Sequence, residues 1–286
     1  RGQDEKTYLR RMQNLDLQKL NETVAYIRGR IQQAPQVGII LGSGLGGLVD
    51  DIDISVNLPY DEIPNFPVST VKGHGGSLLF GKLSGQDVVM LSGRFHYYEG
   101  YSMQEVTFPV RVMKALGASY LLVSNAAGGM NHQYHVGDLM IIRDHINLMP
   151  EHPLRGRNDD TTGPRFPDMT EPYDMVMINK VRAIAAREQI SVHEGVYIGL
   201  QGPTFETKAE YRFLHIIGGD VVGMSTVPEV IVARHAGMRV FGMSVITDVG
   251  IREEMNVITH EEVLQAAAEA APRMALLFRE LIGVLA

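Results

Sequence analysis

The sequence predicts an α/β fold: a single domain in which helices flank a central mixed β-sheet. Short apolar runs that suit buried strands alternate along the chain with longer segments that repeat apolar residues at helical spacing. Several of the helical segments end on a glycine, which is typical of a helix C-terminus. No linker or change of composition interrupts the chain, so we expect one domain over 1–286, with 1–33 as a helical segment packed on it.

The predicted strands are apolar runs bounded by Gly, Pro or polar residues. They lie at 36–41, over 77–93 as a hairpin of two strands, and at 119–129, 137–149, 193–202, 220–225 and 238–248. The predicted helices lie at 5–33, 107–117, 174–188, 207–217 and 226–236, and a last one begins near Thr259. Two helices begin at Thr207 and Thr226, each with a Glu three residues later, which is the spacing of a capping box. Residues 150–173 lack periodicity, and a loop this long is usually either functional or disordered.

Composition excludes several classes of function. The formal net charge of −7 argues against nucleic acid as the main partner, because neutralising phosphates needs clustered Lys and Arg. With no cysteine, the chain has no disulfide framework and no thiolate chemistry. We find no apolar run of the length that a membrane span needs, and the N-terminal stretch is polar, so we expect a cytoplasmic protein with no membrane partner. No ligand motif supports a metal site.

The stretch "GSGLGG" at 42–47 fits the dinucleotide-binding pattern G-x-G-x-x-G directly after an apolar run. A dinucleotide site also needs a second strand with an acidic residue about 20 positions later. Here that region is "LPYDEIPNFPVST", whose three prolines argue against a strand. We therefore disfavour NAD and interpret the loop as a cradle in which backbone N–H groups and the Ser43 hydroxyl hold a simple phosphate. A tight turn without a ligand is the plain alternative.

The segment "SGRFHYYEGY" predicts an anion site. If the segment is extended, alternate side chains share a face, which places Arg94, His96 and Tyr98 together. Phe95 and Tyr97 would then occupy the opposite, packed face. Arg supplies a fork for an oxyanion and His adds a donor, whereas a solvated surface strand would need neither feature.

Further polar residues stand just after predicted strands, the edge at which α/β proteins bind ligands. Phe205 suits a flat heterocycle and Glu206 could accept from ring N–H groups, although an acidic residue near a helix N-terminus is the simpler interpretation. Ser225 precedes a helix, a natural anion site, or belongs to its capping turn. Asp248 is either a turn residue or a buried carboxylate that acts as an acid. His74, in the loop "KGHGG", could cover a bound anion or fill a structural role.

Taken together, the chain resembles the trimeric purine nucleoside phosphorylase family over about residues 35–270. The resemblance rests on "GSGLGGL", "EIPNFPVSTVKGHGG", "GRFHYYEGY", "SNAAGGMN", "GPTFETKAEYR", "GMSTVPEVIVARHAG" and "HEEVLQAA", in this order. It implies phosphorolysis of purine nucleosides to free base and pentose 1-phosphate, in purine salvage. It also implies a homotrimer that needs no cofactor, because inorganic phosphate is a co-substrate.

Motif by motif, the resemblance implies a role for each candidate residue. Phosphate is expected at Ser43, His74, Arg94, His96, Ser225 and the backbone of Ala126. The sugar is expected at Tyr98, Met224 and His260, and the base at Phe205, Glu206 and Asp248. The expected catalytic residues are His96, Glu206 and Asp248. The motif "PRFPDM" points to Phe166 as the residue that closes the pocket of a neighbouring subunit.

Asp248 departs from the family members selective for 6-oxopurines, which carry asparagine at this place. An ionised aspartate would repel O6 but accept from a 6-amino group, and a protonated one could donate to N7. The related methylthioadenosine phosphorylases have an aspartate here and are the alternative assignment, but His260 suits a 5′-hydroxyl better than a methylthio group. We therefore expect inosine and guanosine as preferred substrates, with adenosine a further candidate. A non-catalytic nucleoside-binding protein is the third hypothesis, against which the retained Arg94, His96 and Glu206 argue.

Overall fold

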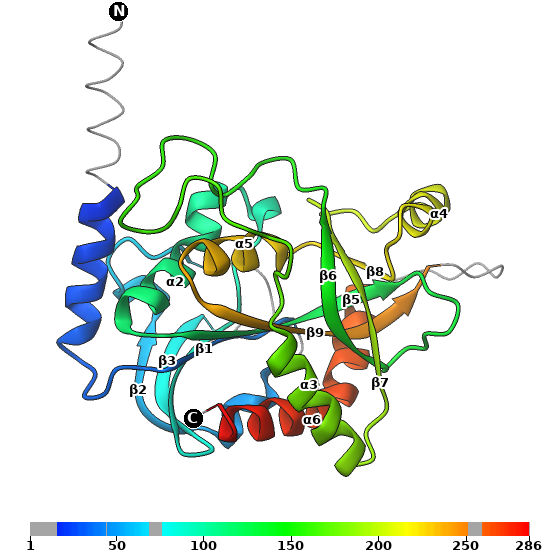
Figure 1. Cartoon of the computed structure of the whole chain (residues 1–286), viewed down its shortest axis with the longest axis horizontal. Helices are drawn as coiled ribbons and strands as arrows, with labels where there is room; N and C mark the ends of the chain where they lie inside the picture. Colours follow the sequence, from blue (N-terminus) through cyan, green and yellow to red (C-terminus); the bar gives the residue numbers. More distant parts are fainter. Residues whose placement is uncertain (1–15, 44, 69–75, 251–258, 286) are drawn as a thin grey trace, which may run out of the picture.

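The computed structural model of the chain describes residues 16–43, 45–68, 76–250 and 259–285 (Figure 1). Within these residues, nine strands form one mixed sheet with flanking helices, which confirms the predicted fold class. The strands are β1 Val37–Ile40, β2 Asp53–Pro59, β3 Ser77–Leu83, β4 Gln86–Ser92, β5 Tyr120–Gly129, β6 Leu139–Asn147, β7 Val192–Gly199, β8 Val221–Gly223 and β9 Arg239–Val249. The first part of the predicted N-terminal helix, over 5–15, lies outside the described residues.

The strand order determines the edge of the sheet at which a ligand site is expected. The sheet runs β2-β3-β4-β1-β5-β8-β7-β6-β9, and an additional pairing of β5 with β9 closes β5, β8, β7, β6 and β9 into a barrel. β1 runs parallel to β4 and to β5, and β5 runs parallel to β9. The carboxyl ends of these four strands therefore meet at one edge, the edge at which α/β proteins bind ligands.

Two pairs of helices cover opposite faces of the sheet (Figure 1). α2 (Met103–Leu116) packs against α5 (Val227–His235), and α3 (Met175–Arg187) packs against α6 (His260–Gly283), which also lies along β9. α4 (Lys208–Ile216) lies toward the edge of the molecule in this view. Three short 3-10 helices complete the described elements: η1 (Gly46–Asp51), η2 (Tyr60–Glu62) and η3 (Tyr97–Glu99).

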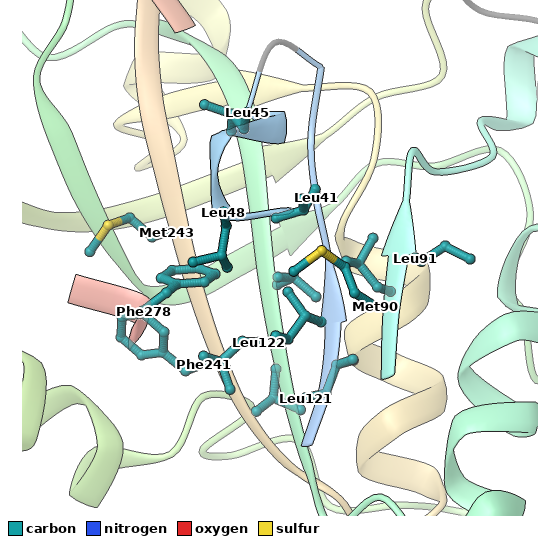
Figure 2. Packing of buried hydrophobic residues seen from close by; sticks show 14 of the residues in the cluster. Leu41, Leu45, Leu48, Met90, Leu91, Leu121, Leu122, Phe241, Met243 and Phe278 are labelled. Atoms are coloured by element: carbon teal, nitrogen blue, oxygen red, sulfur yellow. The ribbon is translucent and has the colours of Figure 1, made fainter. Parts of the chain in front are cut away.

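The largest apolar cluster surrounds β1, and Figure 2 shows its central part. Leu48 of η1 and Leu122 of β5 meet Phe241 of β9 and Phe278 of α6, and all four side chains are fully buried. The two phenylalanine rings pack edge to face with their centroids 5.8 Å apart. Because each such side chain stabilises the fold by about 1.5–3 kcal/mol, this packing anchors η1 and the glycine loop before it.

The N-terminal helix packs on the same core. Residues 16–28 are helical, Val24 and Ile27 are buried in the cluster, and the Thr23 hydroxyl donates to the Pro64 carbonyl at 2.7 Å. These contacts support our proposal that residues 1–286 form a single domain. Among the described helices, none combines the length and the apolar character that crossing a bilayer requires.

Two details of the sequence prediction were wrong. No strand was predicted between the glycine loop and residue 77, yet residues 53–59 form β2, the antiparallel partner of β3. β3 and β4 separate β2 from β1, and the glycine loop leads into a short 3-10 helix, so the dinucleotide pattern still lacks its structural context. α2 begins at Met103, before the predicted start, because Ser102 and Glu105 form a capping box there.

Candidate active site

The segments that follow β1, β4, β7, β8 and β9, together with the end of β5, surround one cavity of about 280 Å³. The cavity brings together residues that are far apart in the sequence, because parallel strands present their carboxyl ends at the same edge. The predicted site residues that line it are Ser43, Arg94, His96, Tyr98, Ala126, Phe205, Glu206, Met224, Ser225, Asp248 and His260.

Gly42 allows the turn after β1 to close on β5. A side chain on Gly42 would meet the Asn125 Cα at 2.7 Å and the Ser124 carbonyl oxygen at 2.9 Å, so only glycine fits. The Gly42 N–H donates to the Ser124 hydroxyl at 3.1 Å. This close approach places Ser43 and Ala126 in the wall of one cavity. Gly44, the second glycine of the motif, lies outside the described residues.

Arg94 lines the cavity with its side chain 1% exposed. Its Nε and one terminal nitrogen donate to the two Glu229 oxygens at 3.1 Å, and the other terminal nitrogen donates to the Ser124 carbonyl at 2.6 Å. The bidentate fork that suggested an oxyanion site thus engages a buried carboxylate, which holds the guanidinium in one orientation. Sequence reasoning missed Glu229 as a partner of the site.

Glu229 was predicted to form a capping box with Thr226, and this prediction was wrong. Thr226, at the N-cap of α5, has a φ of 70° and makes no side-chain capping bond. Its hydroxyl instead accepts a hydrogen bond from the Asn125 amide at 2.8 Å. The buried charge of Arg94 explains the difference, because an unpaired buried guanidinium costs far more free energy than an uncapped helix N-terminus.

The prediction of an extended segment around His96 was only partly right. Residues 97–99 form η3, in which Glu99 accepts from the His96 N–H at 2.7 Å and contacts its ring Nδ1 at 3.2 Å. The His96 and Tyr98 rings nevertheless stack in the cavity wall, 4.7 Å apart, and Phe95 is buried as predicted. Burial lowers the pKa of His96, although the Glu99 contact opposes the shift, so the imidazole is neutral near pH 7.

Met224 and Ser225 follow β8, in the wall of the cavity. The Ser225 N–H donates to the Tyr197 hydroxyl at 3.3 Å, and the Met224 thioether fills space that a side chain at Gly202 would occupy. Nearby, the Asn125 side-chain oxygen is buried and has no hydrogen-bond partner among the described residues. Asn125, which follows an apolar strand run in the sequence, thus adds an acceptor to the cavity wall.

Phe205 and Glu206 stand between β7 and α4. Thr207 caps α4 in the predicted capping box with Glu210, which fixes the two residues just before the helix. The Phe205 ring is 40% exposed in the cavity wall, as an open face for a flat ligand requires. Burial raises the pKa of Glu206, and the nearby Asp248 charge raises it further. Glu206 is therefore a partly buried acid of the site, and the interpretation as a plain helix-terminal charge does not account for it.

Asp248 ends β9 with its side chain buried, and two hydroxyls reach it. The Tyr211 hydroxyl donates to Asp248 Oδ2 at 2.9 Å, and the Thr247 hydroxyl donates to Oδ1 at 3.2 Å. Tyr211 also lies within hydrogen-bonding reach of Glu206. We did not predict Tyr211 or Thr247 from the sequence. Locally, Tyr211 looks like an ordinary buried helix residue and Thr247 like an ordinary β-branched strand residue.

His74 lies outside the described residues, as does the divergent segment 251–258 that follows β9. Phe166 lies in the loop 150–173 and is 87% exposed, whereas His260, the first residue of α6, lines the cavity as predicted. Phe166 therefore does not line the cavity of its own chain.

Comparisons of the sequence and of the structure with known proteins both find phosphorylases. A model of the phosphorylase superfamily matches residues 36–283. Purine nucleoside phosphorylase 1 of Geobacillus stearothermophilus is 52% identical over 246 residues, which cover 86% of this chain and 90% of that protein. The purine nucleoside phosphorylase of Bos taurus is 52% identical over 260 residues, covering 88% of this chain and 90% of that protein. The crystal structure of Schistosoma mansoni purine nucleoside phosphorylase with inosine has a TM-score of 0.89 at 42% identity, covering 94% of this chain and 97% of that one.

Proposed function

We propose that this chain, which belongs to the phosphorylase superfamily and within it to the purine nucleoside phosphorylases, carries out phosphorolysis in the cavity described above. Phosphate attacks C1′ of a purine ribonucleoside or deoxyribonucleoside. The bond from C1′ to the base nitrogen breaks with its electron pair leaving on the base. The products are free purine base and pentose 1-phosphate.

One observation carries the proposal: a single cavity holds two chemically distinct groups of side chains. Ser43, Arg94 and Ser225 supply donors suited to an oxyanion, and Phe205 with Glu206 supplies a flat apolar face and a carboxyl suited to a nitrogen heterocycle. A nucleoside and a phosphate in contact need this combination. Holding both reactants in one enclosed site supplies much of the rate enhancement of a two-substrate reaction.

The chemistry follows from the charges that develop. Cleavage builds positive charge on the sugar and negative charge on the departing base, so the phosphate beside C1′ stabilises the first and a donor at purine N7 stabilises the second. To Asp248, which lines the same cavity, we assign the contact with the position-6 and N7 edge of the base. The scheme uses phosphate as co-substrate and no organic cofactor.

We assign the phosphate subsite to Ser43, Arg94, His96, Ser225 and the backbone of Ala126, with His74 as its cover. Because Glu229 balances the Arg94 charge, this subsite binds a dianion through the geometry of its donors more than through net positive charge. We assign the sugar subsite to Tyr98, Met224 and His260, and the base subsite to Phe205, Glu206 and Asp248. Their common position in the cavity wall supports these assignments.

For the substrates we propose inosine and guanosine as preferred, with adenosine cleaved as well because of Asp248. The Schistosoma mansoni purine nucleoside phosphorylase has been crystallised with inosine and with adenosine, and the schistosome enzyme with guanosine. These complexes support a base subsite in this fold that holds both 6-oxo and 6-amino purines.

We further propose a cytoplasmic homotrimer in which Phe166 reaches the site of a neighbouring subunit. The 87% exposure of this aromatic side chain, on the long loop 150–173, supports the assignment. Analytical ultracentrifugation tests the assembly: a mass of three chains is expected, and a monomer that is fully active would contradict the role of Phe166. Cell fractionation tests the compartment.

The direct test of function is a substrate panel. The purified chain is incubated with inosine, adenosine or methylthioadenosine, with and without phosphate, and free base is followed. We expect phosphate-dependent release of hypoxanthine from inosine, with slower release from methylthioadenosine. Release without phosphate would indicate a hydrolase, preference for methylthioadenosine would favour the alternative phosphorylase, and binding without release would indicate a non-catalytic protein.

A further inference from the structure

We propose that Glu206, Tyr211 and Asp248 form one proton-sharing unit, and that the position of a single shared proton decides whether the base subsite accepts a 6-oxopurine or a 6-aminopurine. This inference rests on the proposed function and deepens it. Tyr211 is a positioning residue in this unit, because it acts through the two carboxyl groups and not on the substrate itself.

Tyr211 lies between the two acids, joined to Asp248 by a hydrogen bond and close enough to Glu206 to form another. The Tyr211 hydroxyl lies 2.9 Å from Asp248 Oδ2 and within hydrogen-bonding reach of Glu206. The tyrosine is 3% exposed, and its position is tightly fixed. A side chain on Gly128 would come within 3.0 Å of the Tyr211 hydroxyl, and one on Gly250 would collide with the ring. Two glycines thus make room for this tyrosine between the two acids.

A buried carboxyl group and a partly buried one, joined in this way, do not ionise independently. Ionising both places like charges in one enclosed wall, so their first and second protons belong to the pair. Burial and the Asp248 charge both raise the pKa of Glu206. Asp248 accepts hydrogen bonds from two hydroxyls, those of Tyr211 and Thr247, which favour its ionised form. On these grounds our scheme places the shared proton of the free chain on Glu206 and the negative charge on Asp248.

That state matches one class of purine. In a 6-aminopurine, N1 is an acceptor and the 6-amino group is a donor. A protonated Glu206 donates to N1, and an ionised Asp248 accepts from the amino group. A 6-oxopurine has the opposite pattern, an N1–H donor and an O6 acceptor. It requires an ionised Glu206 and a protonated Asp248.

Tyr211 connects the two states without any net change in protons. Glu206 passes its proton to the tyrosine oxygen while the tyrosine passes its own proton to Asp248. One O–H bond breaks and one forms at each step of the chain, and the tyrosine is neutral before and after. The fully ionised pair suits neither class of purine, because one carboxylate would then face either O6 or the N1 lone pair.

Within the part of the chain that the structure describes, few other charged groups surround this unit. Glu210 of α4 adds to the rise in the pKa of Glu206. His260 of α6 lines the same cavity, as do Arg94, His96 and Tyr98 from the segment after β4. The residues that β5 and β8 contribute to the wall, at 125–128 and 222–223, carry no titratable side chain. Among the described groups, changes in the base subsite near neutral pH therefore trace mainly to the Glu206 and Asp248 pair.

The substitution Tyr211→Phe tests the unit, because it keeps the ring and removes the hydroxyl. Without its donor, Asp248 ionises less readily and retains the proton, so the 6-oxopurine state is favoured. We expect the adenosine-to-inosine ratio of kcat/KM to fall by about tenfold or more. The loss of inosine kcat/KM at alkaline pH should move upward by about one pH unit. The substrates themselves also titrate. Dividing the kcat/KM of the variant by that of the parent at each pH, at saturating phosphate, cancels this effect.

Two controls separate this role from a structural one. Tyr134→Phe removes another buried tyrosine hydroxyl, one that donates to the Glu194 carbonyl at 3.1 Å, and should change neither the ratio nor the pH profile. In the Asp248→Asn background position 248 can no longer take the proton from Glu206, so Tyr211→Phe should change the ratio less than twofold. Parallel losses for both nucleosides, with an unmoved pH profile, would overturn the proposal.

The parent chain provides a second test that does not depend on any variant folding. Calorimetry in buffers of different ionisation enthalpy counts the protons taken up when adenine or hypoxanthine binds. Because both bases use the same one-proton state, the two counts should agree at every pH from 6 to 8. Counts that differ by about half a proton or more would show that the acids titrate separately. If the parent cleaves no nucleoside at all, the proposed function fails instead.

Discussion

Arg94 and Glu229 form a buried bidentate ion pair, with both nitrogen–oxygen distances at 3.1 Å and side chains 1% and 3% exposed. Arg94 follows β4 and Glu229 lies in α5, so the pair joins the cavity to a helix from the other half of the chain. A desolvated pair of this kind is held together because either partner alone would be an uncompensated charge.

The substitution Glu229→Gln removes one charge and leaves Arg94 buried without its partner. We expect a loss of about 3–5 kcal/mol in the free energy of unfolding, measured by urea denaturation. We also expect kcat/KM for phosphate to fall by about tenfold or more, because the guanidinium loses its fixed orientation.

The surface pair Lys82–Asp87, at 2.9 Å, is the matched control for this prediction. The Lys82 side chain is 57% exposed, so Asp87→Asn should cost no more than about 1 kcal/mol. Equal losses for Glu229→Gln and Asp87→Asn would contradict the account of the buried pair.

His145 makes stability depend on pH in the acid range. Its ring Nδ1 lies 3.0 Å from the Tyr173 hydroxyl, and burial lowers the pKa of His145 from 6.5 to about 4. The unfolded chain therefore binds a proton before the folded chain does. Stability is complete above pH 6.5 and falls as the pH drops toward 4, by at most ~1.4 kcal/mol per pH unit from this group.

Urea unfolding at a series of pH values measures this dependence. The substitution His145→Gln should flatten the curve between pH 6.5 and 4, and a smaller slope should remain because burial also lowers the pKa of His96. Identical slopes for parent and variant would show that His145 titrates normally in the folded chain.

Asp248→Asn should shift substrate preference toward 6-oxopurines. An amide can donate to O6 at every pH, whereas an ionised aspartate accepts from a 6-amino group. We expect the adenosine-to-inosine ratio of kcat/KM to fall by about tenfold or more. An unchanged ratio would falsify the role given to this residue.

Phe205→Ala should weaken nucleoside binding while leaving phosphate binding nearly unchanged. Stacking of a base on an aromatic ring is worth about 1–3 kcal/mol, which corresponds to a rise in nucleoside KM of about 5- to 150-fold. Phe213→Ala is the control, because this phenylalanine is 55% exposed on α4. A similar rise in KM for both variants would mean that the effect comes from the helix and not from the cavity.

Local signals were enough to predict most of the elements and the residues at their ends. The capping box of Thr207 with Glu210 forms as its spacing requires, and β3 and β4 form a hairpin within the predicted range 77–93. The predicted site residues converge because each follows a strand, and the carboxyl ends of parallel strands meet. Barrel closure could not be predicted in this way, since the pairing of β5 with β9 joins distant segments that carry no local mark of each other.

The missed residues share one physical cause. Glu229 and Tyr211 both act through side-chain contacts to distant parts of the chain, Arg94 and Asp248 respectively. Each also had an adequate local explanation, Glu229 as half of a capping box and Tyr211 as an apolar helix residue. Glu229 pairs with the buried charge of Arg94 and does not form the capping box, because the long-range pair stabilises the fold more than the helix cap would.

The central claim is that phosphate is the nucleophile in this cavity, and phosphorus-31 NMR tests it most directly. The parent chain is incubated with inosine and inorganic phosphate, while hypoxanthine is followed by absorbance in the same sample. We predict one ribose 1-phosphate formed for each hypoxanthine released, and no hypoxanthine when phosphate is left out. Hypoxanthine formed together with free ribose, at a rate independent of phosphate, would contradict the account.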